Sequence, residues 1–251
     1  MSIFLRLSKT YFERQLARNL AAAKQISERS AVTAGRVIPD ATDLPIHAGR
    51  RLDAAVMFLD ISKFSSRPSS TDAEQENLLR ILSLFFTEMI RVIEDYGGYL
   101  EKNTGDGLMA YFTKEAGDTV SVQQKAVSAA LTMFTAAAEI VNPLIIASNL
   151  VPIDFRICID HGPITVAKVG AARGFNGIVA IGATANIASK MLAVADANTL
   201  LLGQSMLSGL PANWLQNWVT LKSADTGWIF TETGKPYGFW QYNGRWKVPT
   251  E

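Results

Sequence analysis

Residues 54–66 read Ala-Ala-Val-Met-Phe-Leu-Asp-Ile-Ser-Lys-Phe-Ser-Ser. Six apolar residues are followed directly by an acid, Asp60, and then by mostly small and polar residues. A short apolar run of this kind indicates a strand that is buried on both faces. The residues after Asp60 form a turn whose backbone N–H groups could bind an anion. We therefore expect a carboxylate and an anion-binding turn at one strand end.

A second acid lies in residues 102–112, which read Lys-Asn-Thr-Gly-Asp-Gly-Leu-Met-Ala-Tyr-Phe. The Gly105-Asp106-Gly107 turn leads into another apolar strand, so this segment is typical of a β-hairpin tip. Two carboxylates on neighbouring strand ends, beside a phosphate-binding turn, suit Mg²⁺ or Mn²⁺ holding a nucleoside triphosphate. Either acid alone could simply end a turn, but the two together, with the motifs downstream, favour the metal site.

The composition indicates a globular chain that can bury a substantial core. Of its 251 residues 48% are hydrophobic and 19% are charged, and the net charge of +1 gives no reason to expect a nucleic-acid partner. The single Cys158 excludes an internal disulfide framework and suits a reducing cytosol. We find neither a signal peptide nor an uninterrupted apolar run of membrane-spanning length, so we expect a cytoplasmic protein without an integral membrane segment.

Residues 1–50 differ from the rest. Residues 1–36 carry seven Lys or Arg against two Glu, and Ser8 could cap an amphipathic helix that runs to about Ser30. Such a helix could bind a membrane or nucleic acid, but its narrow apolar stripe lacks Trp, which favours docking on protein. Residues 35–50 read as a linker. We therefore expect an N-terminal helical extension and linker over residues 1–50 and one domain over residues 51–251.

The domain is expected to alternate strands and helices, which indicates an α+β or α/β plan with a mixed sheet. Thr71 or Asp72 would cap a helix to Glu94, and Thr119 or Ser121 would begin an Ala-rich helix that Pro143 stops or kinks. The buried face of the first helix is expected to comprise Leu78, Leu79, Leu82, Phe85, Phe86, Met89, Ile90 and Ile93.

The second half of the domain contains a strand over residues 152–159, ending at Asp160-His161-Gly162-Pro163. Residues 164–169 are predicted to be its antiparallel partner, and residues 170–177 a loop. A helix would start near Ala185, a strand would follow over residues 199–202, and the last thirty residues would finish as short strands.

Four motifs in this order resemble the class III nucleotidyl cyclase domain: residues 58–65, residues 104–110, Asp160-His161-Gly162-Pro163, and residues 181–190. The resemblance covers about residues 51–245. It implies a ferredoxin-like α+β fold with a mixed central sheet flanked by helices. It also implies a homodimer with two active sites shared between head-to-tail subunits.

The resemblance implies a role for each matched residue. Asp60, the carbonyl of Ile61 and Asp106 would hold two Mg²⁺ or Mn²⁺ ions, and Asn186 would orient the ribose. Lys190, four residues later and so on the same helix face, stands where the family usually has Arg and keeps only the charge near the α-phosphate. The backbone of Ser62, Lys63, Phe64 and Ser65 would bind the β- and γ-phosphates.

Two departures concern the substrate. Lys102 matches the lysine that reads the base in adenylate cyclases, but its usual Asp or Thr partner is Val179, which accepts no hydrogen bond. The family's triphosphate-binding lysine is replaced by Thr233, and Lys235 or Lys247 would stand in for it.

Three features distinguish the chain within the class: the fifty-residue N-terminal extension, the Gly-Ala-Thr-Ala-Asn-Ile-Ala-Ser-Lys stretch of residues 182–190, and the aromatic C-terminal tail. In these features the chain is similar to the bacterial pyrimidine cyclases of the Pycsar anti-phage system. That similarity implies synthesis of cyclic UMP, or else cyclic CMP, as an alarm signal. An adenylate cyclase with an altered base pocket and a non-catalytic nucleotide-binding or dimerisation module are the alternatives.

Overall fold

The computed structural model describes residues 31–34, 48–103, 105–172, 175–222, 227–231 and 233–246, and at 31–34, 102–103, 169–172 and 175–178 only the backbone. The strands are β1 (Ala31–Ala34), β2 (Ala48–Ile61), β3 (Gly98–Asn103), β4 (Gly107–Thr113), β5 (Phe155–Ala172), β6 (Phe175–Ile181), β7 (Leu200–Gly203), β8 (Val219–Lys222) and β9 (Phe239–Tyr242). The α-helices are α2 (Asp72–Asp95), α3 (Val122–Ala136), α4 (Asn142–Ala147), α5 (Ala183–Met191) and α6 (Ala212–Trp218). The predicted N-terminal helix lies outside the described residues, and β2 already begins at Ala48, within the predicted linker.

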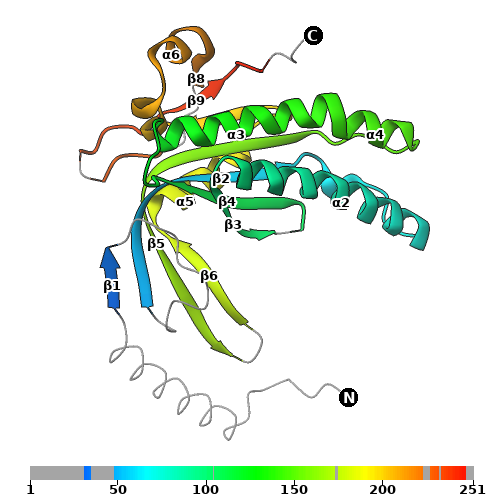
Figure 1. Cartoon of the computed structure of the whole chain (residues 1–251), viewed down its shortest axis with the longest axis horizontal. Helices are drawn as coiled ribbons and strands as arrows, with labels where there is room; N and C mark the ends of the chain where they lie inside the picture. The colour runs from blue at the N-terminus through cyan, green and yellow to red at the C-terminus, as the bar shows by residue number, and fades with distance from the viewer. Residues whose placement is uncertain are drawn as a thin grey trace, which may run out of the picture.

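The strands form one mixed sheet in the order β3-β4-β2-β5-β7-β9-β8, with β1 added to β2 and β6 added to β5. β2 is antiparallel to both β4 and β5, whereas β7 is parallel to β5. Helices α2 and α3 cover one face of the sheet and α5 packs on the other (Figure 1). The predicted α+β fold with a mixed sheet flanked by helices is confirmed.

The alternation of side chains along β2 explains why both faces of the sheet are packed. Its odd-numbered side chains from Ala55 to Ile61 pack in the core under α2 and α3, and its even-numbered side chains from Leu52 to Phe58 pack on the opposite face. The strand is therefore buried on both faces, as predicted. Asp60 continues the even-numbered series, so its side chain leaves the sheet on the α5 face.

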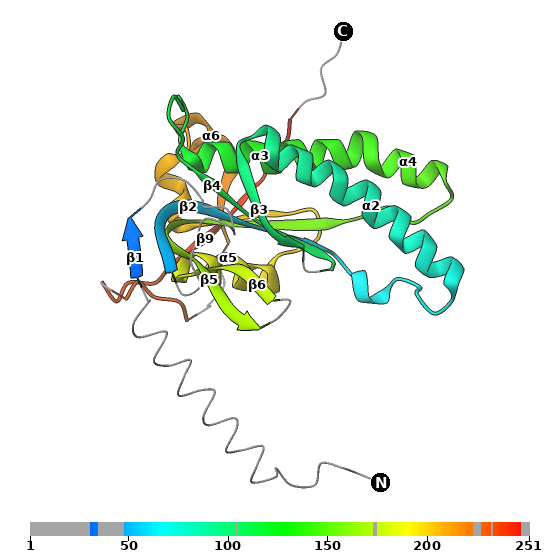
Figure 2. The same cartoon turned by 60° about the horizontal axis from the view of Figure 1, so that its bottom comes forward.

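α2 begins with a capping box. The Thr71 hydroxyl accepts a hydrogen bond from the Glu74 N–H, and the Glu74 carboxylate accepts one from the Thr71 N–H. The predicted buried face is correct at Phe85 and Met89 but wrong at Leu79, whose side chain is 65% exposed. The first turns of α2 project beyond the strands (Figure 2), so an apolar side chain there has little sheet to pack against.

Pro143 does not end the second long helix. α3 passes through a π-helical turn, Ala137–Val141, into α4, which carries Pro143 in its first turn. A missing N–H is tolerated best in that position. The combined helix, Val122–Ala147, is long and apolar enough to cross a membrane, yet half of its most apolar part is buried within the domain. Because its own residues Ala126 and Ala130 are fully buried against the sheet, we interpret it as a core helix of the domain.

The predicted break at residues 160–163 is wrong. β5 is continuous from Phe155 to Ala172 and pairs with β2 over residues 155–167, so Asp160 and Pro163 lie inside the strand. Pro163 is tolerated because β7 pairs with residues 157–159 and β6 with residues 165–172, which leaves the other edge unpaired between them. The antiparallel partner of β5 on that edge is β6, which includes part of the predicted loop.

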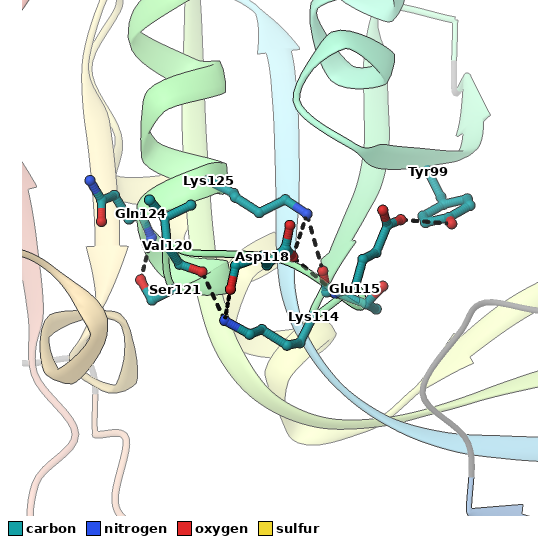
Figure 3. A network of polar contacts seen from close by, with 9 residues as sticks. Tyr99, Lys114, Glu115, Asp118, Val120, Ser121, Gln124 and Lys125 are labelled. Carbon is teal, nitrogen blue, oxygen red and sulfur yellow. Dashed lines mark hydrogen bonds and ion pairs between the residues drawn. The ribbon is translucent and has the colours of Figure 1, made fainter.

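A polar network joins the end of β4 to α3 (Figure 3). The Lys125 ammonium lies 3.0 Å from the Asp118 carboxylate, and the Lys114 ammonium donates to the Asp118 carbonyl oxygen at 3.0 Å. The backbone N–H of Glu115 and the charge of Lys125 lower the pKa of Asp118. The Tyr99 hydroxyl donates to the Glu115 carboxylate at 3.0 Å. This network lies at the opposite end of the β3–β4 hairpin from Asp106.

Candidate active site

The fold brings the two acidic turns together. Asp60, the last residue but one of β2, stands opposite Gly107 of β4, and the Ile61 N–H donates to the Asp106 carbonyl oxygen at 2.9 Å. Gly105 adopts the left-handed φ of 94° at the tip of the hairpin, which a residue with a side chain rarely adopts. The expectation that both acids lie on neighbouring strand ends agrees with this arrangement.

Arg156 is a site residue that sequence reasoning did not identify. It stands directly opposite Asp60 on β5, and its Nε and Nη2 both donate to Asp60 Oδ2, at 2.9 and 2.7 Å. Its Nη1 donates to the Ala195 carbonyl oxygen at 3.1 Å, so the guanidinium is held from two directions. Charge-assisted bonds of this kind orient the carboxylate and balance its charge. The available signal was a base within the otherwise apolar run Phe155-Arg156-Ile157-Cys158-Ile159.

The turn after Asp60 presents free backbone donors. Lys63 has a left-handed φ of 56° and precedes a short 3₁₀ helix, whose first N–H groups lack helical partners. Among the described residues, no hydrogen bond uses the N–H of Lys63, Phe64 or Ser65. The Ser62 N–H, in contrast, donates to the Asp154 carbonyl oxygen at 2.8 Å. The free amides of this turn are therefore those of residues 63–65, whereas the Ser62 amide, also predicted to bind phosphate, already has a partner.

The donor set fits a hard divalent cation. Asp60 and Asp106 supply carboxylate oxygens and Ile61 supplies a carbonyl, which are ligands that Mg²⁺ and Mn²⁺ prefer. Among the described residues there is no cluster of three or more His, Cys, Asp and Glu that could hold a metal by itself. A cation at this turn would therefore complete its coordination with phosphate oxygens and water.

Asn186 and Lys190 lie one turn apart on α5, and both side chains are exposed. No hydrogen bond or ion pair among the described residues joins them to Asp60 or Asp106. The turn that follows Asp60 borders a cavity of about 490 Å³, which Ser62 and Lys63 help to line. The first turns of α5 border another cavity, of about 580 Å³. The two cavities share no lining residue, and neither is lined by Asp60, Asp106, Asn186 or Lys190.

The predicted base-reading pair is not brought together by strand pairing. Lys102 pairs with Met109 at the outer strand β3, and its side chain lies outside the description. Val179 is half-buried on β6, opposite Ala167. Lys235 is exposed in the hairpin of residues 229–236, and Lys247 lies outside the described residues.

A family model described as the adenylate and guanylate cyclase catalytic domain matches residues 46–223. The chain belongs to this class III cyclase family. The matched range contains both acids, Arg156, Asn186 and Lys190, and ends before the hairpin that carries Lys235.

Individual relatives agree with the family. A uridylate cyclase from Burkholderia cepacia is 26% identical over 212 residues, covering 79% of this chain and 87% of the relative. The structure of the guanylyl cyclase Cya2 matches with a TM-score of 0.65 at 20% identity, covering 79% of this chain and 95% of that one. The adenylyl cyclase CyaB from P. aeruginosa matches with a TM-score of 0.59 at 22% identity, covering 81% and 97%. At these identities the two structures establish the fold of the cyclase domain.

The cyclase domain also contains a buried acid, Asp160, for which no role was predicted from the sequence. Asp160 is 2% exposed, and its carboxylate accepts a hydrogen bond from the Tyr237 hydroxyl at 2.5 Å. Burial raises the pKa of Asp160 to about 7, although the hydrogen bond from Tyr237 opposes that rise. The two residues are 77 positions apart, so no local pattern predicts the contact.

Proposed function

We propose that the protein converts a pyrimidine nucleoside triphosphate, UTP in preference to CTP, into its 3′,5′-cyclic monophosphate and pyrophosphate. The observation that carries the proposal is the arrangement of Asp60 and Asp106 on adjacent strand ends beside the free amides of residues 63–65, within a nucleotidyl cyclase domain. The similarity to a uridylate cyclase supports the choice of base.

In this proposal the turn of residues 60–66, together with Asp106, binds the triphosphate. Asp60, Asp106 and the Ile61 carbonyl would hold two Mg²⁺ or Mn²⁺ ions, which when bound acidify the ribose 3′-hydroxyl and neutralise the leaving pyrophosphate. The amides of Lys63, Phe64 and Ser65 bind the β- and γ-phosphates, as free N–H groups of a turn bind anions. Arg156 keeps the Asp60 carboxylate oriented in the site.

The other half of the site comes from a second copy of the chain. Asn186 and Lys190 are exposed and are not bonded to the acids of their own subunit, which supports a homodimer with two shared sites. Asn186 orients the ribose so that its 3′-hydroxyl faces the α-phosphorus, and Lys190 places a positive charge beside the α-phosphate. Lysine supplies this charge without the planar two-pronged contact of arginine.

The base preference follows from the side chain of Val179, which cannot accept a hydrogen bond. A lysine at position 102 can donate to a carbonyl of either pyrimidine. Val179 offers no acceptor, so the exocyclic amino group of adenine or cytosine would be left unpaired, at a cost of about 1–3 kcal/mol. Uracil has no such group. On this basis the product is cyclic UMP, and its role is that of a second messenger in antiviral defence in the cytoplasm, as in the Pycsar cyclases that the sequence resembles.

The test is incubation of the purified protein with each nucleoside triphosphate separately and Mn²⁺, followed by mass spectrometry of the products. We expect cyclic UMP and pyrophosphate, with less cyclic CMP. Cyclic AMP as the main product would identify an adenylate cyclase with an altered base pocket. Binding of nucleotide without any cyclic product would identify a non-catalytic module.

A further inference from the structure

We propose that Asp160 and Tyr237 are positioning residues for the reaction. They fix the hairpin of residues 229–236 opposite α5, so that Lys235 contacts the triphosphate of the nucleotide whose ribose contacts Asn186. This inference rests on the function proposed above and adds a connection between two parts of the active site.

The pair is built into the interior. The Tyr237 hydroxyl donates to Asp160 Oδ1 at 2.5 Å and accepts a hydrogen bond from the Ser205 N–H at 3.2 Å. Tyr237 is 7% exposed, and Asp160 is 2% exposed. A Cβ atom at Gly203 would overlap the Asp160 carboxylate and lie 2.9 Å from the Tyr237 hydroxyl, so glycine there leaves the space the pair needs.

Tyr237 also closes the base of the hairpin. Its N–H donates to the Trp228 carbonyl oxygen at 2.8 Å, and inside the hairpin the Phe230 N–H donates to the Lys235 carbonyl oxygen at 2.8 Å. The Phe230 ring packs on the Tyr237 ring with centroids 4.8 Å apart. Since Asp160 belongs to β5, the Tyr237–Asp160 bond ties this hairpin to the central sheet.

The hairpin faces α5 across a cavity of about 580 Å³. The cavity is lined by Ala183, Thr184 and Ile187 of α5 and by Asp160 and Tyr237. The hairpin contributes Ile229, Phe230, Thr231 and Thr233 to the same lining. α5 also carries Asn186 and Lys190. The orientation of the hairpin relative to α5 therefore determines where Lys235 lies with respect to both.

The first test needs no turnover. Tyr237→Phe removes only the hydroxyl, and Tyr99→Phe is its matched control because it removes a second tyrosine–carboxylate bond, Tyr99 to Glu115, in the network described above. Amide hydrogen exchange is measured over residues 228–237. We expect Tyr237→Phe to speed exchange there about tenfold or more, whereas Tyr99→Phe leaves it unchanged. Unchanged exchange in Tyr237→Phe would overturn the anchoring role.

The second test measures steady-state kinetics with UTP. We expect Tyr237→Phe to raise KM about five- to tenfold with a smaller change in kcat, and to add nothing to the effect of Lys235→Ala in the double variant. Asp160→Asn keeps an acceptor for the Tyr237 hydroxyl, so it should speed hydrogen exchange over residues 228–237 less than Tyr237→Phe does. Additive effects of Tyr237→Phe and Lys235→Ala would overturn the positioning role. Absence of any turnover in the wild type would instead refute the proposed function, while the exchange result still decides the anchoring.

Discussion

Asp60 and Asp160 lie on neighbouring strands and on the same face of the sheet, yet their surroundings are opposite. Asp60 opposes Arg156 in the β2–β5 ladder, and Asp160 opposes Val56. Asp60 is partly exposed at the strand end and paired with a guanidinium. Asp160 is buried in mid-strand, where its hydrogen-bond donor is the neutral hydroxyl of Tyr237 and burial raises its pKa to about 7.

The difference gives the two acids different surroundings for the two roles that we propose for them. A carboxylate that is held by a guanidinium and open to solvent on one side keeps lone pairs available for a further cation. A carboxylate buried without a cation favours its neutral form and acts as a hydrogen-bonding group. In the sequence both acids follow an apolar run, so only the long-range contacts separate their roles.

The largest expected effect comes from replacing Asp60. Asp60→Asn should lower kcat on the order of 1,000-fold or more because a neutral amide is a poor ligand for Mg²⁺ or Mn²⁺. The matched control is Asp53→Asn on the same strand, whose side chain is 69% exposed and lies 3.4 Å from the His161 Nε2 atom. Steady-state kinetics on both variants check this. Comparable activity of the two would refute the role of Asp60 as a metal ligand.

A second prediction concerns the separation of the two half-sites. Asp106→Ala and Asn186→Ala should each be inactive alone. When the two proteins are mixed and their subunits exchange, one site of each heterodimer is intact, so about a quarter of the wild-type activity should return. Failure of rescue, with subunit exchange shown independently by two different tags, would contradict shared sites.

The pH dependence of the free energy of unfolding tests the protonation of Asp160. The pKa of Asp160 is about 7 in the folded protein against an ordinary 3.8, so between these pH values the folded state holds a proton that the unfolded state releases. The free energy of unfolding should therefore fall as the pH rises through this window, by up to about 4 kcal/mol. Asp160→Asn cannot ionise and should escape that loss.

Denaturant unfolding of the wild type and of Asp160→Asn at pH 4 to 8 measures this difference. The stability of the variant relative to the wild type should increase with pH, since other acids contribute equally to both proteins. A difference that does not change with pH would show that Asp160 is charged in the folded protein throughout.

The smallest expected effect concerns the base. Val179→Thr restores a hydrogen-bond acceptor at nearly the same volume and should raise kcat/KM for ATP and CTP relative to UTP by about tenfold or less. Ile181→Thr, two residues further on and 54% exposed, is the control. An equal response of all substrates to both variants would remove Val179 from base selection.

Sequence reasoning predicted those parts of the fold that depend on local patterns. The buried strand before Asp60 and the hairpin tip at Asp106 follow from apolar runs and glycine turns, and both are confirmed. The continuous β5 was missed because Gly162 and Pro163 are usual chain breakers, and only the unpaired edge beside them makes a strand possible. The Arg156–Asp60 and Asp160–Tyr237 contacts were missed because they join residues that are far apart in the sequence, 96 and 77 positions respectively.

Direct competition tests the central claim most directly. The wild-type protein is given UTP, CTP, ATP and GTP at equal concentrations with Mn²⁺, and the cyclic products are quantified by mass spectrometry, with Asp60→Asn as the inactive reference. We predict that cyclic UMP is the main product and that it disappears in the reference. Cyclic AMP or cyclic GMP as the main product, or equal product from Asp60→Asn, would contradict the account.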